Sequence, residues 1–213
     1  MHHILTIGID LISAVLILFP IVSVFLFFSH PRSLKWTALS TLFLLYLCAV
    51  FSAVGFPSIC TLTFDPSIHW LPLLDVFSDP ISYLKNSALN ILLFVPLGIL
   101  LPILWGDHRS AKNILAWGFG LSLTIECLQL FTLRLTDVDD LLMNSLGAIL
   151  GYYLFKVLLP LVQPMETPVP SRRYRRPLVL LPLALLLMFT IQPLLSNAIW
   201  EVLLDSPLWE SIR

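Results

Sequence analysis

The sequence predicts an all-α fold, a polytopic bundle of about six helices that cross a membrane. Of the 213 residues, 58% are hydrophobic and only 12% are charged, whereas soluble domains carry about 25% charged residues. The mean hydropathy is +0.91. Six apolar runs also approach or exceed the about 20 residues that a helix needs to cross a bilayer. These observations exclude a cytosolic enzyme, a secreted disulfide-bonded scaffold and a disordered chain.

The apolar runs divide the chain into an ordered series of elements. They cover residues 4–28, 36–54, 87–105, 111–133, 141–162 and 177–200. The long connection 55–86 is rich in proline, aromatic residues and acids, and its segment His69–Leu73 is expected at the membrane interface, where tryptophan is favoured. We therefore predict an N-terminal helix (1–34), a core (35–162), a basic, proline-rich linker (163–176) and a C-terminal helix with an acidic tail (177–213).

The basic residues predict the orientation of the bundle. Nine of the 12 lysines and arginines fall in connections on one predicted side, namely Arg32, Lys35, Arg109, Lys112, Lys156, Arg172, Arg173, Arg175 and Arg176. The positive-inside rule places this side in the cytoplasm. We thus expect a multi-pass protein of the plasma (inner) membrane with both termini outside the cytoplasm. Ten of the 13 acids fall on the opposite side, so the outer mouth of the bundle is expected to be acidic.

One layer of polar side chains lies just inside the predicted outer surface. Glu126 stands well inside an apolar run, where a charged side chain costs about 2.5–3.5 kcal/mol, so such residues are usually functional. The short link after its helix places Asn144 at a similar depth. We hypothesise an outward-opening pocket whose ligand-binding residues are Asn90, Glu126, Gln129, Arg134, Asp137, Asp140 and Asn144.

Two other interpretations of this layer remain open. Glu126 can pair with Arg134, and Asp140 with Asn144 or Asn90, purely to hold helices together, each bond contributing about 0.6–2 kcal/mol. Alternatively, Asp137, Asp139 and Asp140 can offer oxygen ligands to a divalent metal ion. Asp139 points away from the others at helical spacing, which favours a solvated side chain. No cofactor is identified.

The same residues resemble the VanZ-like membrane protein family over roughly residues 35–155. The resemblance is carried by the segment Asn90–Gly98, the pair Glu126 and Gln129, and then Arg134, Asp137, Asp140, Asn144, Gly147 and Gly151. The family is named after a protein associated with low-level resistance to the glycopeptide teicoplanin. The resemblance therefore implies a site for cell-envelope chemistry, or for a lipid-linked ligand, on the outer side of the membrane.

Three functions fit these observations. The first is binding of a lipid-linked or amphipathic envelope ligand, with glycopeptide tolerance as one consequence. The second is an enzyme that acts on a lipid-linked envelope precursor with Glu126 or Asp140 as general base, although none of the five histidines lies in the predicted site. The third is a proton-coupled transporter, which usually carries its polar site near the midplane. Membrane lipid is an expected partner, and nucleic acid is not.

Overall fold

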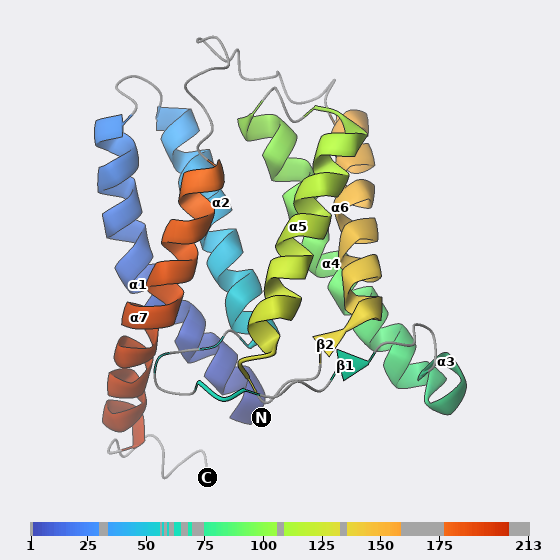
Figure 1. Cartoon of the computed structure of the whole chain (residues 1–213). Helices are drawn as coiled ribbons and strands as arrows, with labels where there is room; N and C mark the ends of the chain where they lie inside the picture. The colour runs from blue at the N-terminus through green and yellow to red at the C-terminus, as the bar shows by residue number, and fades with distance from the viewer. Residues whose placement is uncertain are drawn as a thin grey trace. The chain divides into compact units, whose positions relative to one another are not determined.

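The computed structural model describes seven helices and one short pair of strands. The described residues are 2–29, 34–55, 57, 59, 62–64, 68–69, 75–105, 109–132, 136–158 and 177–204. The helices are α1 (His2–Ser29), α2 (Leu34–Val54), α3 (Asp75–Ser78), α4 (Pro80–Leu104), α5 (Ala111–Gln129), α6 (Val138–Leu158) and α7 (Pro177–Leu204). The strands are β1 (Ile68–His69) and β2 (Thr136–Asp137). The predicted helical fold is thereby confirmed for the described residues (Figure 1).

Three described segments are long and apolar enough to cross a membrane. They are Pro80–Leu104, Val138–Leu158 and Ala184–Val202. Gly8–Ile21 and Ala38–Val54 are apolar but shorter. All six long helices thus occur where the sequence predicts them, while six membrane crossings stay a prediction. Of the predicted interfacial segment His69–Leu73 the structure describes only His69, and residues 70–73 and 163–176 lie outside the described residues.

The chain folds into two compact units, each with its own core. Unit 1 comprises residues 1–62 and 177–213, and unit 2 comprises residues 63–176. In unit 1, helices α1, α2 and α7 pack on one another through apolar side chains. Its fully buried members include Ala14, Leu44, Leu47, Phe51 and Ala184. The backbone N–H of Ile59 donates to the carbonyl of Phe189 at 3.1 Å and so fastens the chain after α2 to α7.

Unit 2 is built on an unusually close approach of two helices. A Cβ atom at Gly147 would overlap the carbonyl oxygen of Ile91, and one at Gly151 would overlap that of Val95. From the first of these contacts to the second, the contacting residue lies four residues further along each helix. Helices α4 and α6 therefore run parallel, as Figure 1 shows. Small residues permit such an approach in membranes, where dispersion contacts replace the hydrophobic effect as the force that packs helices.

Helix α5 packs antiparallel against α6 and is fixed at both ends. A Cβ atom at Gly118 would lie 2.6 Å from that of Ala148. Near the start of α5, the carbonyl oxygen of Arg109 accepts a hydrogen bond from the Tyr152 hydroxyl at 2.9 Å. At the far end, Glu126 contacts the segment that precedes α6. The three long helices of unit 2, α4, α5 and α6, therefore have a defined register, which determines which polar side chains share a layer.

Helix α4 begins seven residues before the apolar run that predicts it. Asp79 caps the helix by accepting a hydrogen bond from the backbone N–H of Ser82 at 3.2 Å, and Pro80 occupies the first turn. Both residue types favour a helix start. Residues 80–86 are therefore helical, which corrects the prediction that the connection continues to residue 86.

The cap at Asp79 makes the start of α4 sensitive to acid. Hydrogen bonds from the side chain and backbone of Ser82 lower the pKa of Asp79 below its ordinary value of 3.8. The cap therefore stabilises the folded helix above that ordinary pKa, and this contribution is lost as the pH falls through the lowered value. We expect amide protection factors at residues 81–83 to fall on acidification in the wild type. In Asp79→Ala the protection factors of these amides should be low at every pH.

Candidate functional site

One face of α5 carries three buried polar side chains. Ser122, Glu126 and Gln129 are spaced four and three residues apart, so they share a face of the helix. Their exposed fractions are 0%, 5% and 6%. The carbonyl of Gln129 accepts hydrogen bonds from the N–H and the hydroxyl of Thr132, both at 2.9 Å. This face of α5 is therefore directed into unit 2, as the sequence predicts for Glu126 and Gln129.

Glu126 holds the segment that leads into α6. Its Oε2 atom accepts the backbone N–H of Asp137 at 3.0 Å. Asp137 in turn accepts the backbone N–H of Asp139 through Oδ1 at 2.9 Å. Such bonds satisfy N–H groups at a helix start, which lack partners within the helix. The charges of Asp137 and Asp140 also act on Glu126, so three predicted acids are close neighbours.

Two hydrogen bonds between helices involve three further residues of the predicted site, Asn90, Asp140 and Asn144. The Asn90 side-chain amide of α4 donates to Oδ1 of Asp140 on α6. The Asn144 amide of α6 donates to the hydroxyl oxygen of Ser122 on α5 at 2.9 Å. Of the two partners that the helix-holding interpretation offers Asp140, the structure shows Asn90, while Asn144 bonds to Ser122 instead. These bonds also reveal that Ser122 belongs to the polar layer.

Asn144 lies deeper than the sequence predicts. It is level with Ser122, which is one helical turn, about 6 Å, from Glu126. The difference arises because Glu126 contacts Asp137, the residue just before α6, so Asn144, seven residues further on, lies beyond the level of Glu126. Asn144 is 3% exposed, and among the described residues its Oδ1 atom has no hydrogen-bond partner. A buried polar atom of this kind is uncommon, since leaving it unpaired costs about 1–3 kcal/mol.

Asp139 differs from its prediction. The side chain is 6% exposed, whereas its position off the stripe favours a solvated carboxylate. The cause is that Asp139 lies in the first turn of α6, against the helix bundle, instead of in an open loop. Within the described residues, no group of three or more His, Cys, Asp or Glu side chains is arranged to hold a metal ion. Arg134 lies outside the described residues, so its predicted pairing with Glu126 stays a prediction.

A short parallel strand pair borders this polar layer. Ile68 pairs with Thr136, and His69 pairs with Asp137, in adjacent strands β1 and β2. The preceding stretch is also attached to the end of α5, since Thr63 donates its N–H to the carbonyl of Phe131 at 3.1 Å. The long connection after α2 therefore returns to the Glu126 end of unit 2, which sequence periodicity cannot indicate for a two-residue strand.

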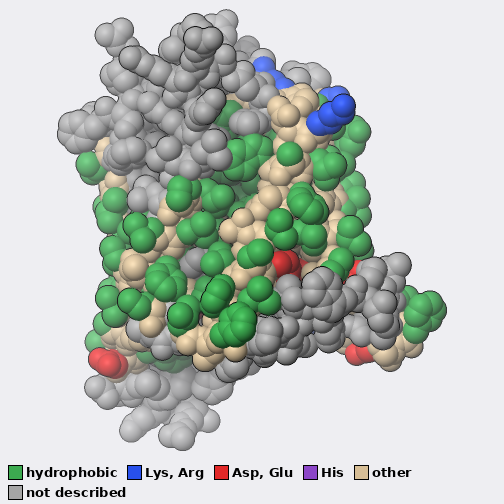
Figure 2. Space-filling view, viewed as in Figure 1, with side chains coloured by type: hydrophobic (Ala, Val, Ile, Leu, Met, Phe, Trp, Pro, Cys, Tyr) green, Lys and Arg blue, Asp and Glu red, His purple; other side chains and the backbone are tan. Residues whose placement is uncertain are grey.

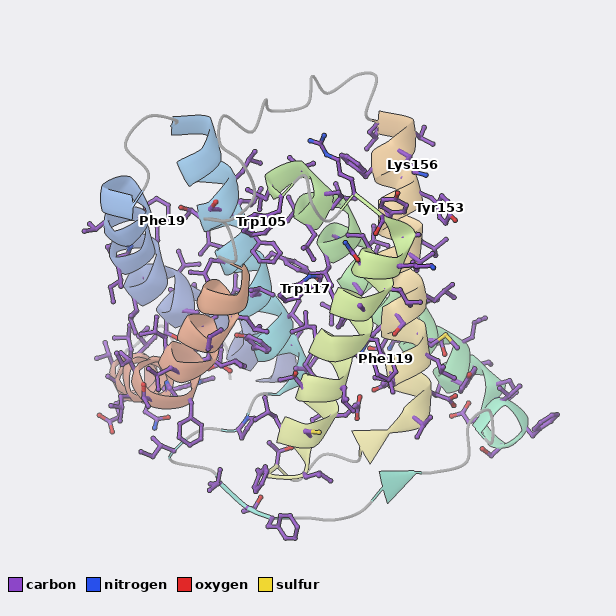
Figure 3. The ribbon with its side chains drawn as sticks, turned by 45° about the horizontal axis from the view of Figure 1, so that its top comes forward. Phe19, Trp105, Trp117, Phe119, Tyr153 and Lys156 are labelled. Carbon is purple, nitrogen blue, oxygen red and sulfur yellow. The ribbon has the colours of Figure 1, made fainter. Side chains whose placement is uncertain are left out.

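Most basic side chains that the structure describes in unit 2 lie toward the end opposite its described acids. Figure 2 shows lysine and arginine at one end of its visible surface, hydrophobic side chains over the middle and acids toward the other end. Lys156 lies at the end of α6 far from β2 (Figure 3), with its Nζ atom 5.0 Å from the centroid of the Tyr152 ring. Arg109 and Lys112, at the start of α5, are both exposed. Arg109, Lys112 and Lys156 therefore lie at one end of unit 2, and that this end faces the cytoplasm stays a prediction.

Two other hydroxyl groups in unit 2, those of Thr124 and Ser145, bond within their own helices. Thr124 donates to the carbonyl of Gly120 at 2.8 Å, and Ser145 donates to that of Leu141 at 2.7 Å. This is the usual arrangement for hydroxyls in apolar helices. Ser122 is different because it accepts a hydrogen bond from another helix. Its spacing of four residues from Glu126 is the signal by which the sequence could have identified it.

The comparisons with known proteins agree with this arrangement. Residues 11–159 match the model of the VanZ/LLP1 family, a range that contains the three long helices of unit 2 and every predicted site residue. Neither the curated proteins nor the solved structures gave a match. The matched range covers more than half of the 213 residues, and the long helices are strongly apolar. The chain therefore belongs to the VanZ/LLP1 family and is a VanZ-like membrane protein.

Proposed function

We propose that unit 2 binds the polar group of a lipid-linked or amphipathic ligand of the cell envelope, in a pocket open to the outer side of the plasma membrane. The observation that carries this proposal is the buried Asn144 side chain, whose Oδ1 atom has no hydrogen-bond partner among the described residues. A hydrogen-bond donor on a ligand would satisfy this atom. The apolar part of such a ligand would lie in the surrounding membrane.

Acids near Asn144 support the same proposal. Glu126, Asp137 and Asp140 lie close enough for their charges to interact. Carboxylates are strong acceptors, and hydrogen bonds to charged groups contribute about 1.5–3 kcal/mol. A ligand with several hydroxyl or amino groups would supply hydrogen-bond donors that suit such acidic surroundings. Glycopeptides such as teicoplanin combine such groups with an apolar chain, so tolerance to teicoplanin is the proposed cellular effect.

Binding by purified full-length protein tests the proposal. The probes are teicoplanin, a polyprenyl-linked cell-wall precursor and plain phospholipid vesicles, and tryptophan fluorescence is the signal. We expect one of the first two to bind, and Glu126→Gln to weaken its binding about tenfold or more through loss of a charged acceptor. Thr124→Val is the matched control, since this hydroxyl bonds only to its own helix.

The outcomes separate the alternatives. No binding of teicoplanin or the precursor, together with unchanged teicoplanin susceptibility in a deletion strain, contradicts the proposal. Conversion of the precursor to a product, lost in Glu126→Gln, would favour the enzyme. Uptake of a probe into proteoliposomes would favour the transporter. Equal weakening by Glu126→Gln and Thr124→Val would indicate a general packing effect and would also contradict a binding role for Glu126.

A further inference from the structure

Three basic side chains lie at the end of unit 2 opposite the polar layer. We call Arg109, Lys112 and Lys156 the basic cluster. Arg109 and Lys112 stand at the start of α5, and Lys156 stands in the last turn of α6. All three side chains are exposed. The antiparallel packing of α5 on α6 brings these positive charges to one end of the unit, where Figure 2 shows lysine and arginine next to hydrophobic side chains.

Tyr152 of α6 contacts two members of the basic cluster. Its hydroxyl donates to the backbone carbonyl of Arg109 at 2.9 Å. Its ring centroid lies 5.0 Å from the Nζ atom of Lys156, a distance at which the face of an aromatic ring attracts a cation. Tyr152 is itself only 3% exposed. One buried side chain therefore sets the positions of Arg109 and Lys156 relative to each other.

The side chain of Arg109 is also attached to α4. Its Nε atom donates to the carbonyl of Pro102 at 3.2 Å. Pro102 lies in the last turn of α4, where carbonyl groups lack partners within the helix. The N–H groups on the two Nη atoms of Arg109 have no acceptor among the described residues. Two such groups form a fork of donors that matches two oxygen atoms of a phosphate.

The basic cluster keeps a positive charge after any pairing with nearby acids. Among the described residues, none of its three side chains forms an ion pair with an acid. Residues 98–118 and 148–158 contain one acid, Asp107, which lies outside the described residues. An ion pair with Asp107 would still leave two of the three positive charges. The charge of the cluster is therefore complementary to an anion.

Exposed apolar side chains adjoin the cluster on α6. Tyr153 and Val157 are 54% and 72% exposed, and their spacing from Lys156 places all three on one face of the helix. The Tyr153 ring centroid lies 5.9 Å from the Nζ atom of Lys156, and Figure 3 shows both residues at this end of α6. Positive charge beside exposed apolar surface suits a lipid headgroup with its acyl chains better than a free anion.

We propose that the basic cluster binds the phosphate of an anionic phospholipid, in the membrane leaflet at this end of unit 2. Arg109 and Lys156 contact the phosphate oxygen atoms, and Lys112 adds attraction from a greater distance. An acyl chain of the same lipid lies on Tyr153 and Val157. Basic sites between membrane helices hold lipid headgroups in this way. The site is at the opposite end from the polar layer, so it does not depend on the ligand proposed above.

Photochemical labelling of the full-length protein in mixed micelles of detergent and phosphatidylcholine tests the proposal. The probe is phosphatidylglycerol with a diazirine in its acyl chain near the headgroup, and peptide mass spectrometry locates the modified residues. We expect labelling of residues 153–157 to saturate as the probe concentration rises. Unlabelled phosphatidylglycerol should compete with the probe, whereas additional phosphatidylcholine and inorganic phosphate should not.

Variants that each remove one positive charge provide the control. Lys156→Gln and Arg109→Gln should each weaken the binding of phosphatidylglycerol about fivefold, since a basic residue near a membrane surface contributes about that factor. Lys85→Gln removes the same charge from an exposed lysine near the start of α4, at the other end of unit 2, and should behave as the wild type. Should Arg109→Gln not fold, the comparison of Lys156→Gln with Lys85→Gln decides.

Three results would overturn the proposal. Labelling that rises without saturation, or that phosphatidylcholine suppresses equally well, would show ordinary contact with bulk lipid. Competition by inorganic phosphate as effective as that by phosphatidylglycerol would show a site for a free anion. Equal weakening in Lys156→Gln and Lys85→Gln would show that the lipid responds only to the net charge of the protein.

Discussion

Replacement of Gly98 by alanine is expected to separate α4 from α6 and to destabilise unit 2. The added Cβ atom would overlap the carbonyl oxygen of Ala148 and lie 2.7 Å from the backbone nitrogen of Tyr152. Backbone atoms in a helix cannot move aside as a flexible side chain can. Overpacking of this kind costs about 1–3 kcal/mol. The free energy of unfolding in mixed micelles measures the effect.

Gly120→Ala is the matched control for this prediction. A Cβ atom at Gly120 has no neighbour within 4 Å, and alanine is about 1 kcal/mol better than glycine in a helix interior. We therefore expect this variant to be as stable as the wild type or more stable. Similar destabilisation of the two variants would show that the close contact between α4 and α6 is not formed.

Asn144→Leu is expected to weaken ligand binding strongly and to leave unit 2 folded. The substitution removes one hydrogen bond between helices, which contributes about 0.6–2 kcal/mol. It also removes a carbonyl oxygen without a described partner, whose burial costs about 1–3 kcal/mol. The two effects nearly cancel, so stability should change by less than about 1 kcal/mol. Binding of the probe that the wild type binds should weaken at least about tenfold.

Ser145→Ala is the control for Asn144→Leu. Ser145 is the next residue along α6 and donates only to the carbonyl of Leu141, so binding should not change. A large loss of stability in Asn144→Leu with unchanged binding would show that Asn144 only holds the helices together. That result would favour the interpretation that the polar layer only holds helices together, and it would count against a ligand-binding pocket.

The helices could be predicted from the sequence because their apolar runs are long. All six long helices coincide with a predicted run, since burial or lipid contact requires continuous hydrophobicity. The start of α4 could not be predicted in this way, because Asp79 and Pro80 act through capping. The strand pair was also missed, since two residues carry no detectable period.

The polar layer could be predicted in part. Glu126, Asp140 and Asn90 were identified because charged and amide side chains are rare in apolar helices. Ser122 was missed because serine is common there and usually bonds to its own helix. The burial of Asp139 was also missed, since it depends on where α6 begins. Sequence spacing places residues on a helix face, but only the register between helices determines which faces meet.

The central claim is that polar side chains of α4 and α6 meet inside unit 2, and disulfide cross-linking in native membranes tests it most directly. With Cys48, Cys60 and Cys127 replaced by serine, Asn90→Cys combined with Asp140→Cys should form a disulfide on mild oxidation. Asn90→Cys combined with Leu142→Cys should not, since Leu142 is half exposed on another face of α6. Absence of the first cross-link, or equal formation of both, would contradict the arrangement of the site.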